Sequence, residues 1–263
     1  MGEDIDVLYD FIASGPTATR SDCDREFREN LMIRYQDRVT GDYNDFWAGR
    51  DYLNQLQPMK AAMLMAHAFN DWNVMPEHSV RIYEAVKAKG LPHQIYFHQG
   101  GHGGPPPMKQ MNRWFTRYLY GLENGVEKDP KSWVVREGAT RGNPESYPDY
   151  PHPEAAAVTL RPNPGGVTAG ALTLSTPDAK PAERQLESLI DNFSFSGAIL
   201  AKADWTNHRL LYTTPELKEP LHLSGTARIR IRLSSSQPAA NLSVWLVSLP
   251  WTDSRLITDD VIT

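Results

Sequence analysis

The sequence has a single cysteine, no excess of basic residues and no long hydrophobic run. Cys23 alone cannot form an intrachain disulfide, and it excludes a zinc site built from several cysteines. Lysine and arginine number 27 against 32 aspartate and glutamate, a formal net charge of -5, so the chain lacks the basic field that binds nucleic acid. Its longest apolar run, Ala61–Ala66, has six residues, whereas a membrane-spanning helix needs about 20. Nucleic acid and membrane are therefore not expected as partners.

The first residues, MGEDIDVLYDF, also lack the basic start and the apolar stretch of a signal peptide. The composition leaves the compartment undetermined. The chain is long, with 263 residues. At about 150 residues per domain, this length predicts one large domain or two ordinary ones. The composition changes once, near Asp129–Pro130, where helical patterns with short apolar runs give way to short β-like runs between proline- and glycine-rich turns. Two domains, or parts of two, are expected.

Before residue 129, helical and strand patterns alternate. An amphipathic helix is expected after Ser21, because apolar residues recur every four positions and Gly41 stands at the C-terminal cap. The apolar residues of this helix are Phe27, Leu31, Tyr35 and Val39. The elements expected next are a strand over Ala61–Ala68, a helix from Pro76 to Gly90, a strand over Gln94–Phe97, and a helix with Met108, Met111, Phe115, Tyr118 and Leu122 on one face. Strands that alternate with helices predict a parallel α/β sheet.

After residue 129, the apolar pattern acquires a period of two. In Ala227–Leu233 apolar residues alternate with Arg228, Arg230 and Arg232, which predicts an antiparallel strand with one buried face and one wet face. Similar short runs occur at Ala157–Leu160, Ala171–Leu174, Arg209–Tyr212, Leu221–Leu223 and Leu242–Leu249. So many short strands predict an all-β sandwich of the jelly-roll kind.

Two polar side chains follow the two strands predicted in the first part of the chain. Asp71 comes just after Ala61–Ala68, and His102 follows Gln94–Phe97 in a loop with two glycines on each side. Because functional side chains gather beyond the carboxyl ends of parallel strands, both loops are expected at one sheet edge. A carboxylate next to an imidazole can orient the ring and stabilise its charged form, as in a Ser-His-Asp triad. Asp71 and His102 are therefore the candidate catalytic residues.

The sequence offers no clear nucleophile for this pair. α/β-Hydrolases carry serine in a Gly-x-Ser-x-Gly turn that precedes the acid and the histidine. Neither Ser14 nor Ser196 has the two glycines of that motif, and little sheet-like sequence lies before Asp71. The nucleophile is therefore expected upstream of Met1, in a longer protein of which this chain would be a fragment.

Three stretches of the sequence carry more distinctive motifs. They are Ala66–Val74 with its Asn-Asp-Trp-Asn-Val motif, the loop around His102, and the region from Thr213 to Val244 with its Leu-Ser-Ser-Ser motif. Together they resemble the Xaa-Pro dipeptidyl-peptidases, serine peptidases related to bacterial cocaine-esterase and glutaryl-acylase hydrolases. The resemblance covers most of residues 43–263.

This resemblance implies the C-terminal part of an α/β-hydrolase followed by an incomplete jelly roll. Residues 1–55 resemble the end of a helical cap, 56–128 the C-terminal part of the hydrolase core, and 129–263 the start of the jelly roll. Asp71 and His102 fall on the family's catalytic acid and base. The implied reaction releases X-Pro dipeptides from peptide amino termini through an acyl-enzyme, so the expected substrate is a peptide with proline at its second position. The serine and the oxyanion-hole donors are missing, and the chain alone is therefore expected to be inactive.

Two other functions stay open on the sequence. The same acid and base would serve an acyl esterase or acylase of the same superfamily, because ester and amide cleavage share this chemistry. In the other alternative the β-sandwich is a non-catalytic binding module whose tryptophans stack on carbohydrate. The tryptophans concerned are Trp133, Trp205, Trp245 and Trp251.

The remaining histidines have structural interpretations. His67, inside the first predicted strand, is expected to be a hydrogen-bonded structural residue, and His98 is expected to pack under the His102 loop. No cofactor or metal is predicted, because no cluster of histidine and aspartate shows ligand spacing. Sheet edges exposed at the ends of the chain favour association, so a homo-oligomer stays open.

Overall fold

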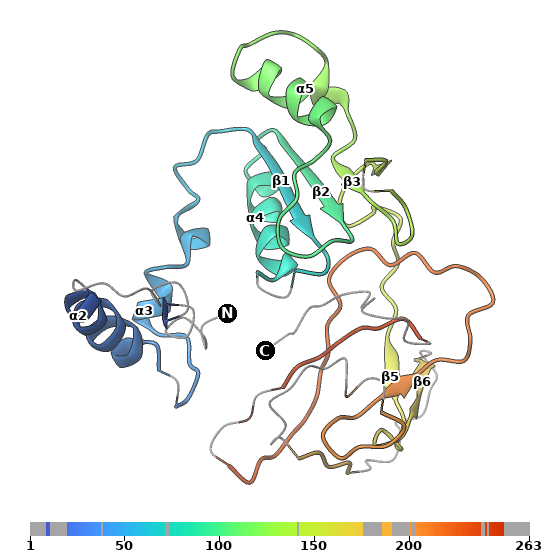
Figure 1. Cartoon of the computed structure of the whole chain (residues 1–263). Coiled ribbons are helices and arrows are strands. Elements are labelled where there is room, and N and C mark those ends of the chain that lie inside the picture. The colour runs from blue at the N-terminus through green and yellow to red at the C-terminus, as the bar shows by residue number, and fades with distance from the viewer. Residues whose placement is uncertain are drawn as a thin grey trace. The chain divides into compact units, whose positions relative to one another are not determined.

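The computed structural model describes residues 9–10, 20–37, 39–71, 74–140, 142–175, 186–190, 200, 203–237, 240 and 242–249 (Figure 1). These residues form two compact units, and each is considered by itself. The first is built mainly from residues up to Pro148 and also includes Arg228–Trp245, whereas the second is built mainly from Asp149–Ala227. Among the described helices, none is both long enough and apolar enough to cross a membrane.

A four-stranded sheet with the order β1-β2-β3-β4 forms the centre of the first unit. β1 (Met63–Ala68), β2 (His93–His98) and β3 (Ser132–Val134) run parallel, and β4 (Glu145–Tyr147) pairs antiparallel with β3. The strands predicted before residue 129 are confirmed as β1 and β2. β3 and β4 continue the same sheet beyond residue 129, which makes β2 an interior strand, buried from Gln94 onward.

α4 (Pro76–Ala88) connects β1 to β2 and has the ends that the sequence predicts. Met75 is extended, and Pro76 occupies the first turn, where a proline costs no hydrogen bond. The helix ends before Gly90, whose φ of 68° lies in the left-handed region that favours glycine. The buried face of α4 consists of Pro76, Ser79, Val80, Tyr83 and Val86. This face packs on β1 and β2 and forms the core of the unit together with Ile95, Tyr96 and Phe97.

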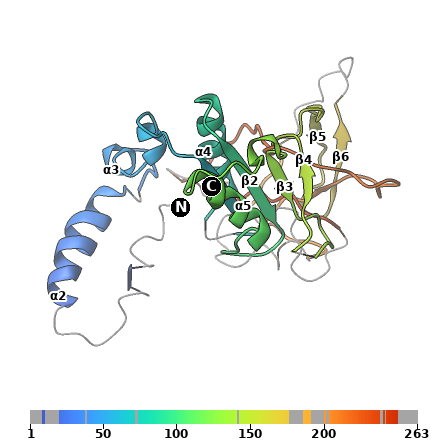
Figure 2. The same ribbon diagram turned by 90° about the horizontal axis from the view of Figure 1, so that it is seen from above.

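α4 and α5 (Met108–Tyr118) cover opposite faces of β2. The ring of Tyr83 on α4 packs edge-on against His93, with 5.1 Å between the ring centroids. The next residue of the strand, Gln94, instead accepts a hydrogen bond of 3.2 Å from Nε2 of Gln110 on α5. Because consecutive side chains of a strand point to opposite faces, the sheet lies between the two helices, as Figure 2 shows.

The buried face of α5 differs from the predicted one. Met108 and Phe115 are exposed, and the helix ends before Leu122, which is exposed as well. The buried residue is Trp114, which is 3% exposed and packs against the ring of Tyr118. Trp114 has the largest apolar surface on this helix, so its burial decides which side of the helix faces the protein.

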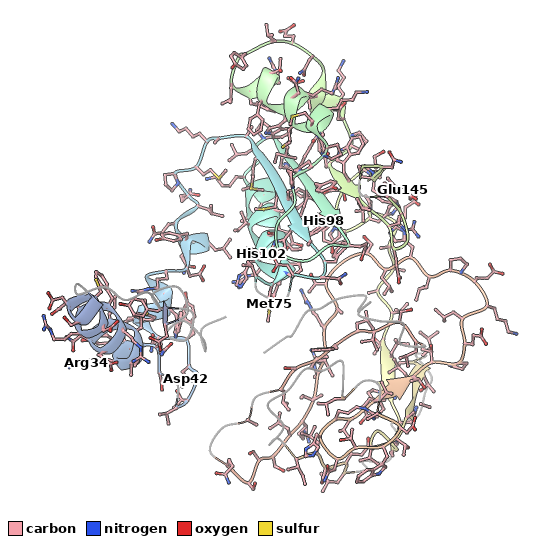
Figure 3. All side chains as sticks on the ribbon, viewed as in Figure 1. Arg34, Asp42, Met75, His98, His102 and Glu145 are labelled. Carbon is pink, nitrogen blue, oxygen red and sulfur yellow. The ribbon has the colours of Figure 1, made fainter. Side chains whose placement is uncertain are left out.

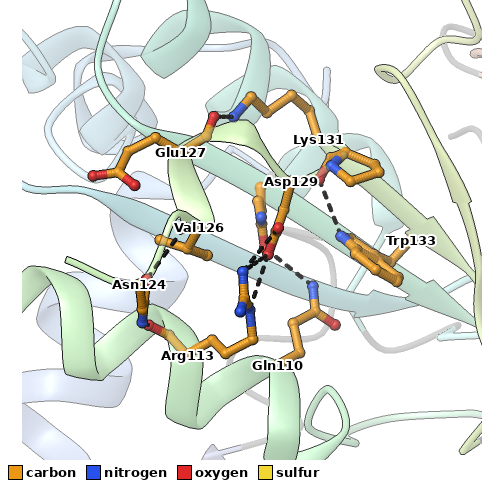
Figure 4. Close-up of polar contacts among 10 residues, drawn as sticks. Gln110, Arg113, Asn124, Val126, Glu127, Asp129, Lys131 and Trp133 are labelled. Carbon is orange, nitrogen blue, oxygen red and sulfur yellow. Dashed lines mark hydrogen bonds and ion pairs between the residues drawn. The ribbon is translucent and has the colours of Figure 1, made fainter. Parts of the chain in front are cut away.

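The segment between α5 and β3 is held by side-chain hydrogen bonds and an ion pair (Figure 4). Nη2 of Arg113 lies 2.9 Å from both carboxylate oxygens of Asp129, and Nε lies 3.1 Å from Oδ2. Nδ2 of Asn124 donates to the Arg113 carbonyl, and the indole of Trp133 donates to the Pro130 carbonyl. The bonds of Arg113 tie Asn124 and Asp129 to α5, and the Trp133 bond fixes the start of β3.

A helix begins where the sequence predicts one, but it ends before Val39 and before the predicted cap Gly41, and no residue of its π-helical part is buried. α2 (Arg20–Cys23) continues into a π-helical segment of 10 residues, η1 (Asp24–Ile33). Phe27, Tyr35 and Val39 are all exposed. Amphipathic spacing identifies the face that would pack, but burial requires a partner surface that the spacing does not specify.

Three short elements complete the first unit. α3 (Asp45–Ala48) and η2 (Tyr52–Gln55) lie where no element was predicted, and η3 (Val126–Lys128) precedes β3. α3 begins with a cap, because the side-chain oxygen of Asn44 accepts from the N–H groups of Phe46 and Trp47.

The second unit contains a three-stranded sheet with the order β5-β6-β7. β5 (Leu160–Pro162) is antiparallel to β6 (Gly170–Leu174), and β7 (Tyr212–Thr213) is parallel to β6. Each of these strands overlaps a predicted run. Beside them, the carboxylate of Glu187 accepts hydrogen bonds from the N–H groups of Gly165 and Gly166 and from the Tyr212 hydroxyl.

The antiparallel strand predicted at Ala227–Leu233 does not form. Ile229, Ile231 and Leu233 are about half exposed, and the segment pairs with no strand among the described residues. Leu221–Leu223 is likewise not a strand. The alternation of apolar and polar residues indicates which side chains a strand would bury. A strand also needs a neighbouring strand that forms hydrogen bonds with its N–H and C=O groups. The jelly-roll architecture therefore stays a prediction.

The burial of Trp114 can be tested against that of its neighbour on α5. Trp114→Ala should lower the free energy of unfolding by about 3–5 kcal/mol, because it empties a buried site. Phe115→Ala, at a side chain that is 46% exposed, should change it by about 0.5 kcal/mol or less. Urea unfolding of both variants measures the difference. Equal losses of unfolding free energy in the two variants would contradict the burial of Trp114 and the exposure of Phe115.

Candidate active site

The loops at the carboxyl ends of β1 and β2 bring the two predicted catalytic residues together. Figure 3 shows His102 at this end of the sheet. Nδ1 of His102 lies 3.0 Å from Oδ2 and 3.2 Å from Oδ1 of Asp71. Asp71 is 3% exposed, whereas the side chain of His102 is 61% exposed. The carboxylate is therefore inside the protein, and the imidazole reaches its surface.

The partners of His102 indicate where its proton lies. An ionised carboxylate only accepts hydrogen bonds, so Nδ1 of His102 carries the proton that faces Asp71. In the neutral ring, Nε2 then has a free lone pair and can take a proton from a hydroxyl group or a water molecule. The carboxylate fixes this tautomer and stabilises the imidazolium that proton transfer creates. The pair is thus suited to general base catalysis and then, in reverse, to general acid catalysis.

The carboxylate of Asp71 has further contacts on its own side of the site. Oδ1 accepts a hydrogen bond of 2.9 Å from the Val74 N–H, which closes the turn that leads to α4. Oδ2 lies 3.3 Å from Nε2 of His67. His67 is hydrogen-bonded as predicted, to the Val74 carbonyl and to the Ser79 hydroxyl. Its contact with the acid was missed, because the only signal in the sequence is a histidine four residues before Asp71.

The loop that carries His102 is fixed by bonds to both neighbouring strand ends. Nδ2 of Asn70 donates to the Gln99 carbonyl at 2.9 Å, and the Gln99 side chain donates to the Val135 carbonyl at 3.1 Å. His98 is buried under the loop as predicted, and its Nδ1 accepts from the Gly100 N–H. A Cβ atom at Gly100 would lie 2.9 Å from that ring nitrogen, so the close turn requires glycine.

A pocket of about 210 Å³ opens beside the pair. Its lining consists of Ala66, His67, Ala68, Asp71, Val74, His102, Gly103 and Gly104. Gly103 and Gly104 have φ values of 83° and 126°, backbone conformations that favour glycine and leave this wall without side chains. No serine, threonine or cysteine belongs to the lining, so these residues supply the acid and the base but no nucleophile.

Among the described residues, the other candidates from the sequence do not line this pocket. Ser14, Ser196 and Trp251 lie outside the described residues. Trp205 is exposed in the second unit, and Trp133 is bonded to the Pro130 carbonyl. Within the described part of the chain, no group of three or more histidine, cysteine, aspartate or glutamate side chains is arranged to hold a metal ion.

Comparison with known proteins gives matches over both parts of the chain. Residues 1–104 match the family described as X-Pro dipeptidyl-peptidase (S15 family), and residues 124–263 match the X-Pro dipeptidyl-peptidase C-terminal non-catalytic domain. A putative Xaa-Pro dipeptidyl-peptidase of Rhodopirellula baltica is 60% identical, over 100% of this chain and 42% of its own length. The Xaa-Pro dipeptidyl-peptidase of Lacticaseibacillus rhamnosus is 28% identical, over 94% of this chain and 32% of its own length.

A crystal structure of a CocE/NonD family hydrolase from Staphylococcus aureus is also similar, with a TM-score of 0.41 and 17% identity, over 54% of this chain and 25% of that one. The chain spans 42% and 32% of the lengths of the two peptidases named above. The resemblance suggested by the sequence motifs is confirmed by the two family matches: this chain belongs to the X-Pro dipeptidyl-peptidase (S15) family of serine peptidases.

Proposed function

We propose that Asp71 and His102 are the acid and the base of a serine peptidase that releases X-Pro dipeptides from peptide amino termini. The observation that carries this proposal is the hydrogen bond between the buried carboxylate and Nδ1 of the exposed imidazole. It joins the ends of two adjacent parallel strands, and a pocket lies beside it. The nucleophilic serine would come from a part of a longer protein that precedes this chain.

The proposed reaction has two steps that share one proton carrier. The serine oxygen attacks the main-chain carbonyl carbon of the substrate's proline. As this bond forms, the hydroxyl proton of the serine passes to Nε2 of His102. The C–N bond then breaks, and the same proton passes to the leaving amine, which leaves the dipeptide as an ester of serine. In the second step, Nε2 takes a proton from water, the resulting hydroxide displaces the serine oxygen, and the proton returns to that oxygen. Asp71 remains ionised throughout.

The substrate class is supported by the relatives rather than by the pocket. The Rhodopirellula baltica protein carries the name of an Xaa-Pro dipeptidyl-peptidase at 60% identity over the whole of this chain. The expected substrate is therefore a peptide with a free amino terminus and proline at its second position. An acyl esterase would use the same acid and base, and no described residue favours it over the peptidase.

We also propose a correspondence between segments of the chain and domains of the family. Residues 1–55 would end a helical cap, residues 56–128 would form the last part of the hydrolase core, and residues 129–263 would begin a jelly roll. Within the last segment, β3 and β4 pair with the sheet of the first unit, so the jelly roll itself would begin after them. The family match over residues 124–263 to a domain described as non-catalytic supports the last assignment. A carbohydrate-binding function of this part is not favoured, because both family matches are to X-Pro dipeptidyl-peptidases.

The 263-residue chain alone should not hydrolyse X-Pro anilides at a measurable rate. The acid and the base can move a proton, but without the serine no acyl-enzyme forms. The measurement is a spectrophotometric assay of Gly-Pro p-nitroanilide and a benzoyl ester with the purified chain, and His102→Ala is its control. Turnover that disappears in His102→Ala would show that a nucleophile lies within the chain.

In the longer protein that contains the serine, Asp71→Asn should lower kcat about 10⁴-fold, because an amide no longer fixes the His102 tautomer. A matched control is Asp129→Asn, whose carboxylate pairs with Arg113 away from the pocket. This control should leave kcat nearly unchanged. Steady-state kinetics on Gly-Pro p-nitroanilide gives both values. A clear preference of the unmodified protein for the benzoyl ester would overturn the peptidase assignment in favour of an esterase.

A further inference from the structure

A second histidine, His67, lies beside the Asp71 carboxylate in addition to the proposed base. It is on β1, on the face that α4 covers, and its side chain is 8% exposed. Its Nε2 lies 3.3 Å from Oδ2 of Asp71, while His102 approaches the same oxygen at 3.0 Å. Two imidazoles thus approach the same carboxylate oxygen, one buried and one open to solvent.

The partners of His67 determine its tautomer. Nε2 faces the Val74 carbonyl at 2.7 Å as well as the Asp71 carboxylate, and neither oxygen can donate. Nε2 must therefore carry a proton. Nδ1 lies 2.5 Å from the hydroxyl oxygen of Ser79 on α4, which can donate to a neutral ring. A neutral His67 with its proton on Nε2 satisfies all these groups.

We propose that His67 is a positioning residue that holds the Asp71 carboxylate in the orientation needed to fix the tautomer of His102. The inference rests on the proposed function of the Asp71–His102 pair. A buried carboxylate is stable only if hydrogen-bond donors replace its water. Val74 donates its main-chain N–H to Oδ1 of Asp71, and Nε2 of His67 donates to the carbonyl of the same Val74 residue while lying 3.3 Å from Oδ2. His67 thereby holds the turn whose N–H fixes the Asp71 carboxylate toward His102.

The first test needs no catalytic activity. Imidazole ¹⁵N chemical shifts of the 263-residue chain, recorded where the rings are neutral, should show His67 protonated at Nε2 and His102 protonated at Nδ1. In His67→Leu, which removes the donor, His102 should change toward the tautomer mixture of an unconstrained imidazole. His67→Gln, whose amide can still donate, should preserve the Nδ1 proton.

His93→Leu is the matched control for this measurement. His93 lies on the same face of the neighbouring strand, against Tyr83, and has no contact with Asp71 given by the structure. The His93→Leu substitution should therefore leave the His102 tautomer unchanged. His67 protonated at Nδ1 instead of Nε2 would overturn the proposal even if none of the variants folds. An unchanged His102 tautomer in folded His67→Leu would overturn it as well.

The second test measures catalysis in the longer protein that supplies the serine. His67→Leu should lower kcat by about 10²-fold, the cost of a small misplacement of a catalytic group, with little change in KM. His67→Gln should recover most of the loss. Equal kcat losses in both variants would indicate a structural role only and would overturn the proposal. If the unmodified longer protein does not cleave X-Pro peptides, the proposed function fails, whereas the tautomer measurement still decides the role of His67.

Discussion

The buried charge of Asp71 is the constraint on which the site depends. A carboxylate removed from water needs N–H groups in place of its hydration. The turn after β1 supplies the N–H of Val74, and the loop after β2 supplies Nδ1 of His102. His67 on β1 lies 3.3 Å from Oδ2 and donates to the Val74 carbonyl. The parallel pairing of β1 and β2 makes this convergence feasible, because it ends both strands at the same edge of the sheet.

The central part of this arrangement could be predicted from the sequence because each signal was local or topological. β1 and β2 are short apolar runs, and Pro76 and Gly90 mark the two ends of the helix between them. The contact between Asp71 and His102, 31 residues apart, follows from the rule that parallel strands joined by a helix end together. No knowledge of side-chain packing was needed for either prediction.

The features that sequence reasoning missed depend on surfaces that are distant in the chain. The rotation of α5 follows from where Trp114 finds space, and an apolar stripe at regular spacing does not contain that information. The alternating pattern of Ala227–Leu233 predicts a strand, but it does not predict which strand would pair with it. The contact of His67 with Asp71 depends on the turn that follows β1, so the spacing of the two residues in the sequence does not predict it.

The bonds between the two loops have a consequence for motion. Asn70, next to the acid, is bonded to the Gln99 carbonyl, and the Phe69 N–H is bonded to the His98 carbonyl at the base of the other loop. The acid and the base are thus cross-linked through the residues that precede them, and neither loop can swing outward without breaking these bonds. A displacement of either loop would therefore disturb the contact between Asp71 and His102, which joins them.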